Sequence, residues 1–101
     1  MSTVREITHM SEHDGFIANN PSAMIFFGSI RCGHCQDIKP VFDQLARQYP
    51  TVAFGHVETT RVKCENVDGV PVFVGYKNQR ALEPILGANE QELTRMAQKL
   101  A

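Results

Sequence analysis

Two thiols stand three positions apart in the segment Cys32-Gly33-His34-Cys35. If a helix begins at Cys32, the second thiol lies one turn further along the same face. The start of a helix offers unpaired N–H groups and the positive end of the helix dipole, and both stabilise a thiolate. A thiolate attacks disulfides, and a second thiol nearby can then resolve the mixed disulfide. The pair is therefore suited to two-electron thiol–disulfide exchange.

The cysteines could also bind a metal. Cys32 and Cys35, together with His34 and Cys64, supply the ligand types that zinc prefers. The sequence has no second Cys-x-x-Cys pair, and His34 inside a two-residue turn points poorly toward the same ion. We therefore expect neither a metal nor a cofactor. Cys64 is interpreted as an ordinary thiol, with a regulatory or intermolecular disulfide as the alternative. His9, His13 and His56 are interpreted as surface or strand residues without a role.

The elements on either side of the dithiol would position it. Residues 23–27 form an unbroken apolar run, which is typical of a central strand covered on both faces. After Cys32 the apolar residues follow three- and four-residue steps, which predicts an amphipathic helix. Pro40 should kink this helix and Pro50 should end it. The dithiol is thus expected where a buried strand turns into a helix.

The remaining segments complete an alternation of strands and helices. We expect strands at 4–8, 52–57, 72–76 and 81–86, with Pro84 making the last an edge strand, and a turn at 77–80. We expect a helix capped by Ser11 and ended at 19–21, a short helix at 60–66, and a last helix capped by Asn89 with Glu92 as its capping-box partner. The order predicts an α/β fold with a mixed central sheet flanked by helices on both faces.

Length, composition and charge restrict the classes of function. The chain has 101 residues, 43% of them hydrophobic, and a net charge of −1 at pH 7. This suits a single domain over residues 1–101 and gives no basic surface for nucleic acid or anionic membrane. The first residues lack the pattern of a signal peptide, and residues 23–27 are too few to span a bilayer. A cytoplasmic protein is expected.

Taken in order, these motifs resemble the thioredoxin superfamily over nearly the whole chain. The resemblance rests on the apolar strand, the Cys-Gly-His-Cys motif, Pro40, Gly69-Val70-Pro71, the turn at Lys77-Asn78, and Gly87-Ala88 before the last helix. It implies a thioredoxin fold, with Cys32 as the attacking thiol and Cys35 as the resolving thiol. Pro71 would be cis, and Val70 would offer backbone groups to an extended substrate segment, beside Arg31.

The resemblance also implies partners. It predicts a monomeric thiol–disulfide oxidoreductase that acts on protein disulfides and receives electrons from a dithiol donor such as a thioredoxin reductase. The Gly-His pair between the cysteines is similar to protein disulfide isomerase domains. His34 should therefore make the disulfide more oxidising than in typical thioredoxins. The alternative is a binding or scaffold module of the same fold with little redox turnover.

Several positions depart from the family pattern. Phe26 stands where the family has a buried acid, and Phe54 aligns with the lysine that often pairs with that acid. We therefore expect a dry, apolar pocket beneath the dithiol, with Phe54 opposite Phe26 and a high pKa for Cys35. Arg31 stands where the family usually has a tryptophan, and Gly28 and Gln36 also differ from the residues usual in the family. These departures affect turnover and substrate range more than the exchange chemistry.

Overall fold

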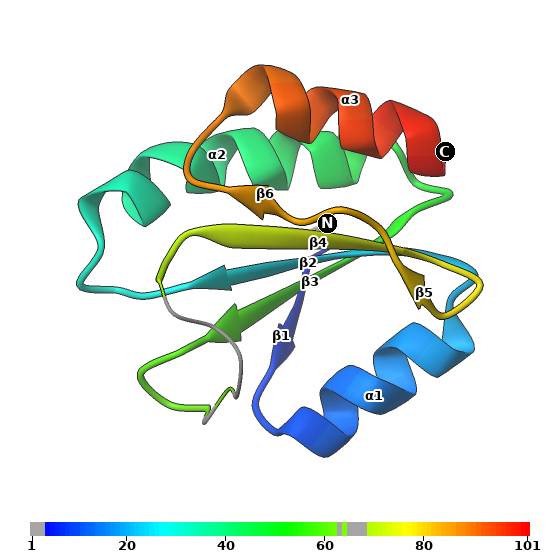
Figure 1. Ribbon diagram of the computed structural model, residues 1–101, viewed down its shortest axis with the longest axis horizontal. Coiled ribbons are helices and arrows are strands. Elements are labelled where there is room, and N and C mark those ends of the chain that lie inside the picture. Colours follow the sequence, from blue (N-terminus) through cyan, green and yellow to red (C-terminus); the bar gives the residue numbers. More distant parts are fainter. Residues whose placement is uncertain (1–3, 63, 65–68) are drawn as a thin grey trace.

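The computed structural model describes residues 4–62, 64 and 69–101, which form one mixed sheet with helices on both faces (Figure 1). The strands are β1 (Val4–Ile7), β2 (Ser22–Gly28), β3 (Ala53–Glu58), β4 (Val72–Lys77), β5 (Arg80–Ala81) and β6 (Ile85–Leu86). The helices are α1 (Met10–Asn19), α2 (Gly33–Gln48) and α3 (Glu90–Leu100). The predicted α/β fold, with a mixed central sheet flanked by helices on both faces, is confirmed.

The order of the strands places β2 at the centre of the sheet. The sequence of neighbours is β1-β3-β2-β4-β5, with β6 also paired to β4. β1, β3 and β2 run parallel, whereas β4 is antiparallel to β2. In Figure 1 the end of β2, the start of α2 and the start of β4 therefore meet at one end of the sheet. This end carries the dithiol.

Each face of the sheet has its own hydrophobic core. All seven residues of β2 are buried, as expected for a strand covered on both sides. α2 and α3 cover one face, and their core includes Phe26, Phe42, Phe54 and Phe73. α1 covers the other face, where Ile25, Phe27 and Val57 are buried. The alternation of side chains along β2 thus supplies both cores.

The start of α1 differs from the prediction. The N-cap is His9, whose side chain makes no capping hydrogen bond, so Ser11 is not the cap. Instead the Glu12 carboxylate accepts hydrogen bonds from the backbone N–H and the hydroxyl of Thr8. These bonds, led by that of the hydroxyl, lower the pKa of Glu12. Glu12, the third residue of the helix, therefore reaches back over the helix start and binds the residue before the N-cap.

Two further elements depart from expectation. Of the predicted helix at 60–66, residues 60–62 form a turn and a bend, while residues 63, 65 and 66 lie outside the described part of the chain. The predicted strand at 81–86 is two short strands, β5 and β6, interrupted around Pro84. A proline lacks the N–H that continuous pairing with β4 requires. The turn at 77–80 is confirmed, with positive φ at Asn78 and Gln79.

The last helix is capped as predicted, but only in one direction. The Asn89 side chain accepts a hydrogen bond from the Glu92 N–H at 3.0 Å. In a full capping box the Asn89 N–H would donate to the Glu92 side chain, but here it donates to the carbonyl of Gly87 at 3.2 Å. Within the described ranges, no helix has the length and apolarity needed to cross a membrane.

Candidate active site

The dithiol lies at the N-terminus of α2, where local hydrogen bonds fix its geometry. Cys32 is the N-cap residue, with extended backbone angles, and its N–H donates to the Ser29 carbonyl at 3.1 Å. The Cys35 N–H donates to the Cys32 sulfur at 3.2 Å. A donor aimed at the sulfur stabilises negative charge there, as the position at the helix start also does. This arrangement suits Cys32 as an attacking thiol.

The loop before β4 faces the same sulfur. The Val70–Pro71 peptide bond is cis, as the resemblance implied. The Cys32 thiol donates to the Val70 carbonyl at a distance of 3.7 Å, and the Pro71 carbonyl accepts from the Gly87 N–H at 2.9 Å. Cys32 is half-buried and Val70 packs beside it against the core. The structure thus brings Cys32, Val70 and Pro71 together.

Cys35 lies below Cys32 and is 3% exposed. Burial, followed by the interaction with Cys32, raises the pKa of Cys35 to about 11. The high pKa expected from the sequence is therefore confirmed. Cys35 remains protonated at neutral pH, so its attack on a mixed disulfide requires that a proton be removed.

Phe26 and Gly28 are linked departures from the family pattern. A Cβ atom on residue 28 would lie 2.7 Å from the Phe26 ring and 3.5 Å from the Cys35 sulfur. The ring at position 26 therefore requires glycine at position 28. Phe26 is buried and stacks on Phe73 at a ring-centroid distance of 4.7 Å, with Phe42 at 5.2 Å.

The expectation that Phe54 lies opposite Phe26 is wrong. In the pairing of β2 with β3, Phe26 is matched with His56, and Phe54 with Met24. The His56 imidazole lies 5.0 Å from the Phe26 ring, between centroids, and its Nδ1 lies 2.8 Å from a Glu6 carboxylate oxygen. Sequence reasoning assigned His56 no role, yet it is a buried polar side chain beside the site.

The dry, apolar pocket expected beneath the dithiol stays a prediction, because the cavity found there has both apolar and polar walls. A cavity of about 130 Å³ is lined by Cys35, Phe26, Ser29, Ile30, Gln36, Lys39, His56 and Glu58. Burial acts to raise the pKa of Glu58, but hydrogen bonds from Thr60 and from the Ile30 N–H lower it overall. A cavity of this size with several polar walls can hold water.

The remaining predicted site residues lie at the surface. Gly33, His34 and Arg31 are exposed, and the Arg31 N–H donates to the Ser29 hydroxyl at 3.0 Å. Ile30 and Leu86, which sequence reasoning missed, are 63% and 75% exposed. Large apolar side chains left in water beside a reactive group are the available signal for such residues. Among the described residues, no three potential ligands gather in a metal site.

A helix-terminal Cys-x-x-Cys pair that faces a cis-proline loop in this sheet defines a thiol–disulfide oxidoreductase. The protein family described as Thioredoxin matches residues 4–99. Putative thioredoxin-5 of Dictyostelium discoideum is 32% identical over 102 residues, which cover 95% of this chain and 97% of that protein. The chain belongs to the thioredoxin family and is a protein-disulfide oxidoreductase with a redox-active dithiol.

Solved structures agree with this assignment. Thioredoxin from Plasmodium falciparum superposes with a TM-score of 0.89 at 29% identity, over 96% of this chain and 99% of that one. Mitochondrial thioredoxin 3 from Saccharomyces cerevisiae gives a TM-score of 0.88 at 27% identity, over 96% and 95% of the two chains. The similarity therefore extends over the whole fold.

Proposed function

We propose that Cys32 attacks a disulfide of a substrate protein and that Cys35 then resolves the mixed disulfide. In the first step the Cys32 thiolate bonds to one substrate sulfur, and the other sulfur leaves as a thiolate. In the second step Cys35 attacks the Cys32 sulfur, which releases the second substrate thiol and forms the Cys32–Cys35 disulfide. Two electrons pass to the substrate. The 3.2 Å contact between the Cys35 N–H and the Cys32 sulfur carries this assignment.

We further propose that an extended substrate segment pairs with the backbone of Val70, beside Pro71. Val70 belongs to a loop rather than a strand, and its carbonyl faces the Cys32 thiol. Main-chain bonds to an extended segment give affinity with little demand on sequence. Ile30 and Leu86 are exposed and offer apolar contacts to a substrate, and Arg31, also exposed, offers charge to the residues flanking the substrate cysteine.

Regeneration requires a dithiol donor of the thioredoxin reductase type, because the cycle leaves Cys32 and Cys35 oxidised. We propose that residues 1–101 act as one monomeric domain in the cytoplasm. The Gly33-His34 pair, which is similar to that of protein disulfide isomerase domains, would make the dithiol more oxidising than a typical thioredoxin. His34 is exposed in the first turn of α2, for which Cys32 is the N-cap.

For the proton of Cys35, we propose the His56–Glu6 pair as the acceptor. The His56 Nδ1 contacts the Glu6 carboxylate, which leaves Nε2 free to accept a proton through water in the cavity that His56 shares with Cys35. The Glu6 side chain is 61% exposed and connects the pair to solvent. The pair would replace the buried acid that Phe26 lacks. Glu58 and Lys39 also line this cavity and are the competing groups.

The proton route can be tested in a single turnover. A mixed disulfide between Cys32 and thionitrobenzoate releases a coloured thiolate when Cys35 attacks. His56→Gln should slow this release by about 100-fold near neutral pH and leave it almost unchanged at high pH, where hydroxide can take the proton. Glu58→Gln is the matched control on the same strand and cavity wall. If Glu58→Gln slowed the release and His56→Gln did not, the His56–Glu6 pair would be rejected as the proton acceptor.

The alternative is a binding module with little turnover. Insulin reduction with dithiothreitol as electron donor separates the two functions. We expect turnover by the wild type, and a stable mixed disulfide between Cys32 and a substrate protein in Cys35→Ala. A fold-competent wild type without turnover would favour the binding module.

A further inference from the structure

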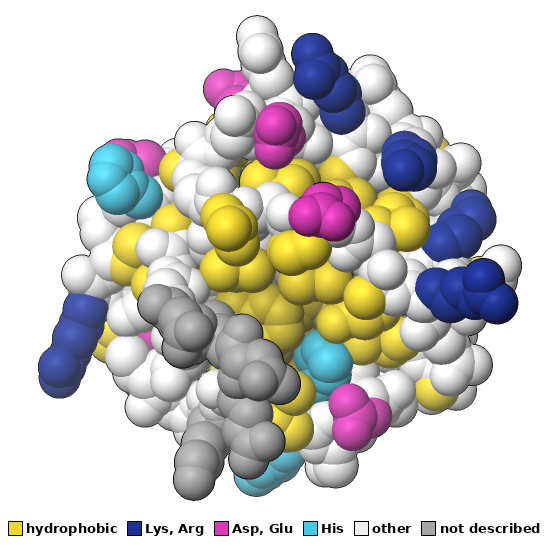
Figure 2. Space-filling model, viewed as in Figure 1, with side chains coloured by type: hydrophobic (Ala, Val, Ile, Leu, Met, Phe, Trp, Pro, Cys, Tyr) yellow, Lys and Arg dark blue, Asp and Glu magenta, His cyan; other side chains and the backbone are white. Residues whose placement is uncertain are grey.

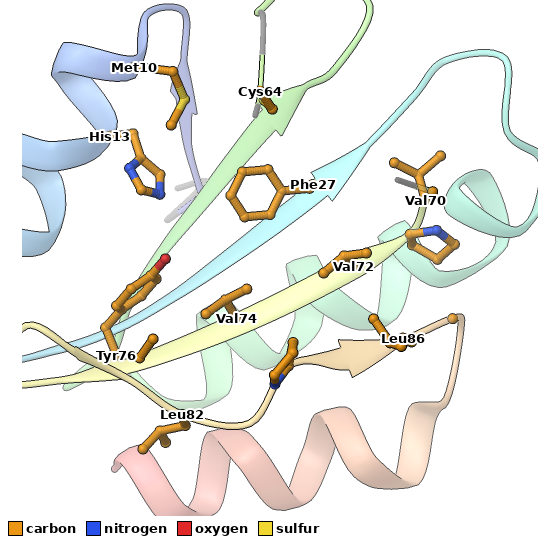
Figure 3. Close-up of a pocket in the computed structure, with 15 residues that line it drawn as sticks. Met10, His13, Phe27, Cys64, Val70, Val72, Val74, Tyr76, Leu82 and Leu86 are labelled. Carbon is orange, nitrogen blue, oxygen red and sulfur yellow. The ribbon is translucent and has the colours of Figure 1, made fainter. Parts of the chain in front are cut away.

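The two thiols lie beside two different hollows of the surface. A groove of about 760 Å³ begins at Val70, which faces Cys32, and runs along β4 to α1. Figure 2 shows apolar side chains gathered in the middle of this face of the molecule, and Figure 3 shows His13 among the side chains that line the groove. His13 is 7% exposed, so the expectation that it is a surface residue is wrong. Cys35 instead lines the cavity of about 130 Å³ together with Ser29, so the backbone near Ser29 is placed to act on the buried thiol.

The end of β2 passes close to the buried sulfur. A Cβ atom on residue 28 would lie 3.5 Å from the Cys35 sulfur, and this position is held by glycine. The next residue, Ser29, is 8% exposed. Burial and then Cys32 raise the pKa of Cys35, whereas a hydrogen bond from the Ser29 backbone acts to lower it. A backbone N–H that faces a sulfur favours the thiolate, which is the attacking form.

The peptide unit that joins Gly28 to Ser29 is held from its other side by Thr59, which follows β3. The Thr59 N–H and hydroxyl both donate to the Gly28 carbonyl, at 2.8 and 3.2 Å. The N–H bond continues the pairing of β2 with β3, whereas the hydroxyl bond depends on the side chain. Because a peptide unit is planar, a carbonyl fixed by Thr59 also fixes the direction of the Ser29 N–H. Hydrogen bonds to the carbonyl strengthen the N–H of the same unit as a donor.

We propose that Thr59 is a positioning residue for the resolving thiol and acts through the peptide unit between Gly28 and Ser29. The Thr59 hydroxyl orients and polarises this unit. The Ser29 N–H then stabilises the Cys35 thiolate when Cys35 loses its proton and attacks the Cys32 sulfur. This role rests on the proposed function, in which Cys35 resolves the mixed disulfide.

The test separates the two steps of one turnover. Excess dithiobis(nitrobenzoate) reacts with the reduced Cys64→Ala protein, in which the dithiol provides the two remaining thiols. Attack by Cys32 releases one thionitrobenzoate, and attack by Cys35 on the resulting mixed disulfide releases a second. In this background Thr59→Val should slow the second release by about 3- to 10-fold near neutral pH and leave the first almost unchanged. The Ser29 amide resonance should also move in the ¹H–¹⁵N spectrum of the reduced protein.

Two variants control for packing. Thr59→Ser keeps the hydroxyl and should restore the second release to within about 2-fold of its original rate. Thr94→Val removes a hydroxyl bond to the Glu90 carbonyl on α3 and should leave both releases and the Ser29 amide unchanged. An unchanged second release in Thr59→Val, equal slowing of both releases, or a Ser29 amide that stays in place would overturn the role of Thr59. A Cys35→Ala protein that still gave the second release would instead overturn the proposed function, because another group would then resolve the mixed disulfide.

Discussion

Replacing Cys35 with alanine should remove a pH-dependent part of the stability of the reduced protein. Burial raises the pKa of Cys35 from an ordinary value of 9.0 to about 11. Between these two values the folded protein holds a proton on Cys35 that the unfolded chain has already lost. The folded state then binds more protons than the unfolded state, so the free energy of unfolding falls as pH rises through this range. Below pH 9 the contribution is fully present.

The size of the effect follows from the two pKa values. At about pH 10, one unit above the unfolded value, the loss is about 1.4 kcal/mol relative to neutral pH, because one pKa unit corresponds to that energy. Alanine also leaves a small cavity and lowers stability at every pH. That cost is independent of pH, so only the change in the difference between the two proteins reports the thiol.

Urea unfolding of both proteins at about pH 8 and about pH 10, under reducing conditions, measures this change. The stability advantage of the wild type over Cys35→Ala should shrink by about 1 kcal/mol across the interval. Cys64→Ala is the control, since Cys64 is half-buried and its thiol donates a hydrogen bond to the Val62 carbonyl. Its pKa is also raised by burial, so a smaller change is expected. A difference between wild type and Cys35→Ala that is the same at both pH values would refute the desolvation of Cys35.

Three other predictions concern the dithiol end of the sheet, and a fourth concerns the N-cap of α3. Brief alkylation of the reduced protein near neutral pH should label Cys32 before Cys35, as mass spectrometry of peptides can show; the reverse order would reverse their roles. The reduction potential of the wild type should lie between about −180 and −270 mV, and His34→Pro should shift it toward about −270 mV. An unchanged potential would show that His34 does not set it. Phe26→Asp should destabilise the protein by about 3 kcal/mol or more, since a packed ring is lost, and should speed the release of thionitrobenzoate near neutral pH. An unaltered rate of release in Phe26→Asp would mean that Cys35 needs no further proton acceptor. Asn89→Ala should cost about 1 kcal/mol in urea unfolding, because the Glu92 N–H loses its cap.

Apolar periodicity carried the prediction of most elements around the site. The unbroken apolar run of β2 indicates a strand that is buried on both faces. The apolar residues at three- and four-residue steps in α2 indicate a helix that is buried along one side. The junction between them located the dithiol. The same reasoning failed at 60–62, where no apolar stripe distinguishes a helix from a turn. It also failed at His13, because a polar residue within α1 was assigned to the surface by type.

The register between β2 and β3 cannot be predicted from the pattern of residues along the chain. The expectation that Phe54 lies opposite Phe26 rests on the resemblance to a family in which these two positions often hold a polar pair. The actual partner is His56, two residues further along the same face of β3. Parallel strands are joined through a helix, so no turn of fixed length sets their register as it does in a hairpin. Only the structure could bring His56 beside Phe26 and into one cavity with Cys35.

This register explains how the site can dispense with a buried acid. A carboxylate at position 26 would be enclosed by Phe42 and Phe73, with a large cost of desolvation. The ring of Phe26 instead contributes to the core at that position and requires glycine at position 28. In the proposed mechanism the proton passes to β3, where the His56–Glu6 pair reaches solvent through a carboxylate that is 61% exposed. A base connected to water costs less to ionise than one sealed in the core. Phe26 therefore stabilises the fold, and in the proposed mechanism His56, its neighbour on β3, accepts the proton.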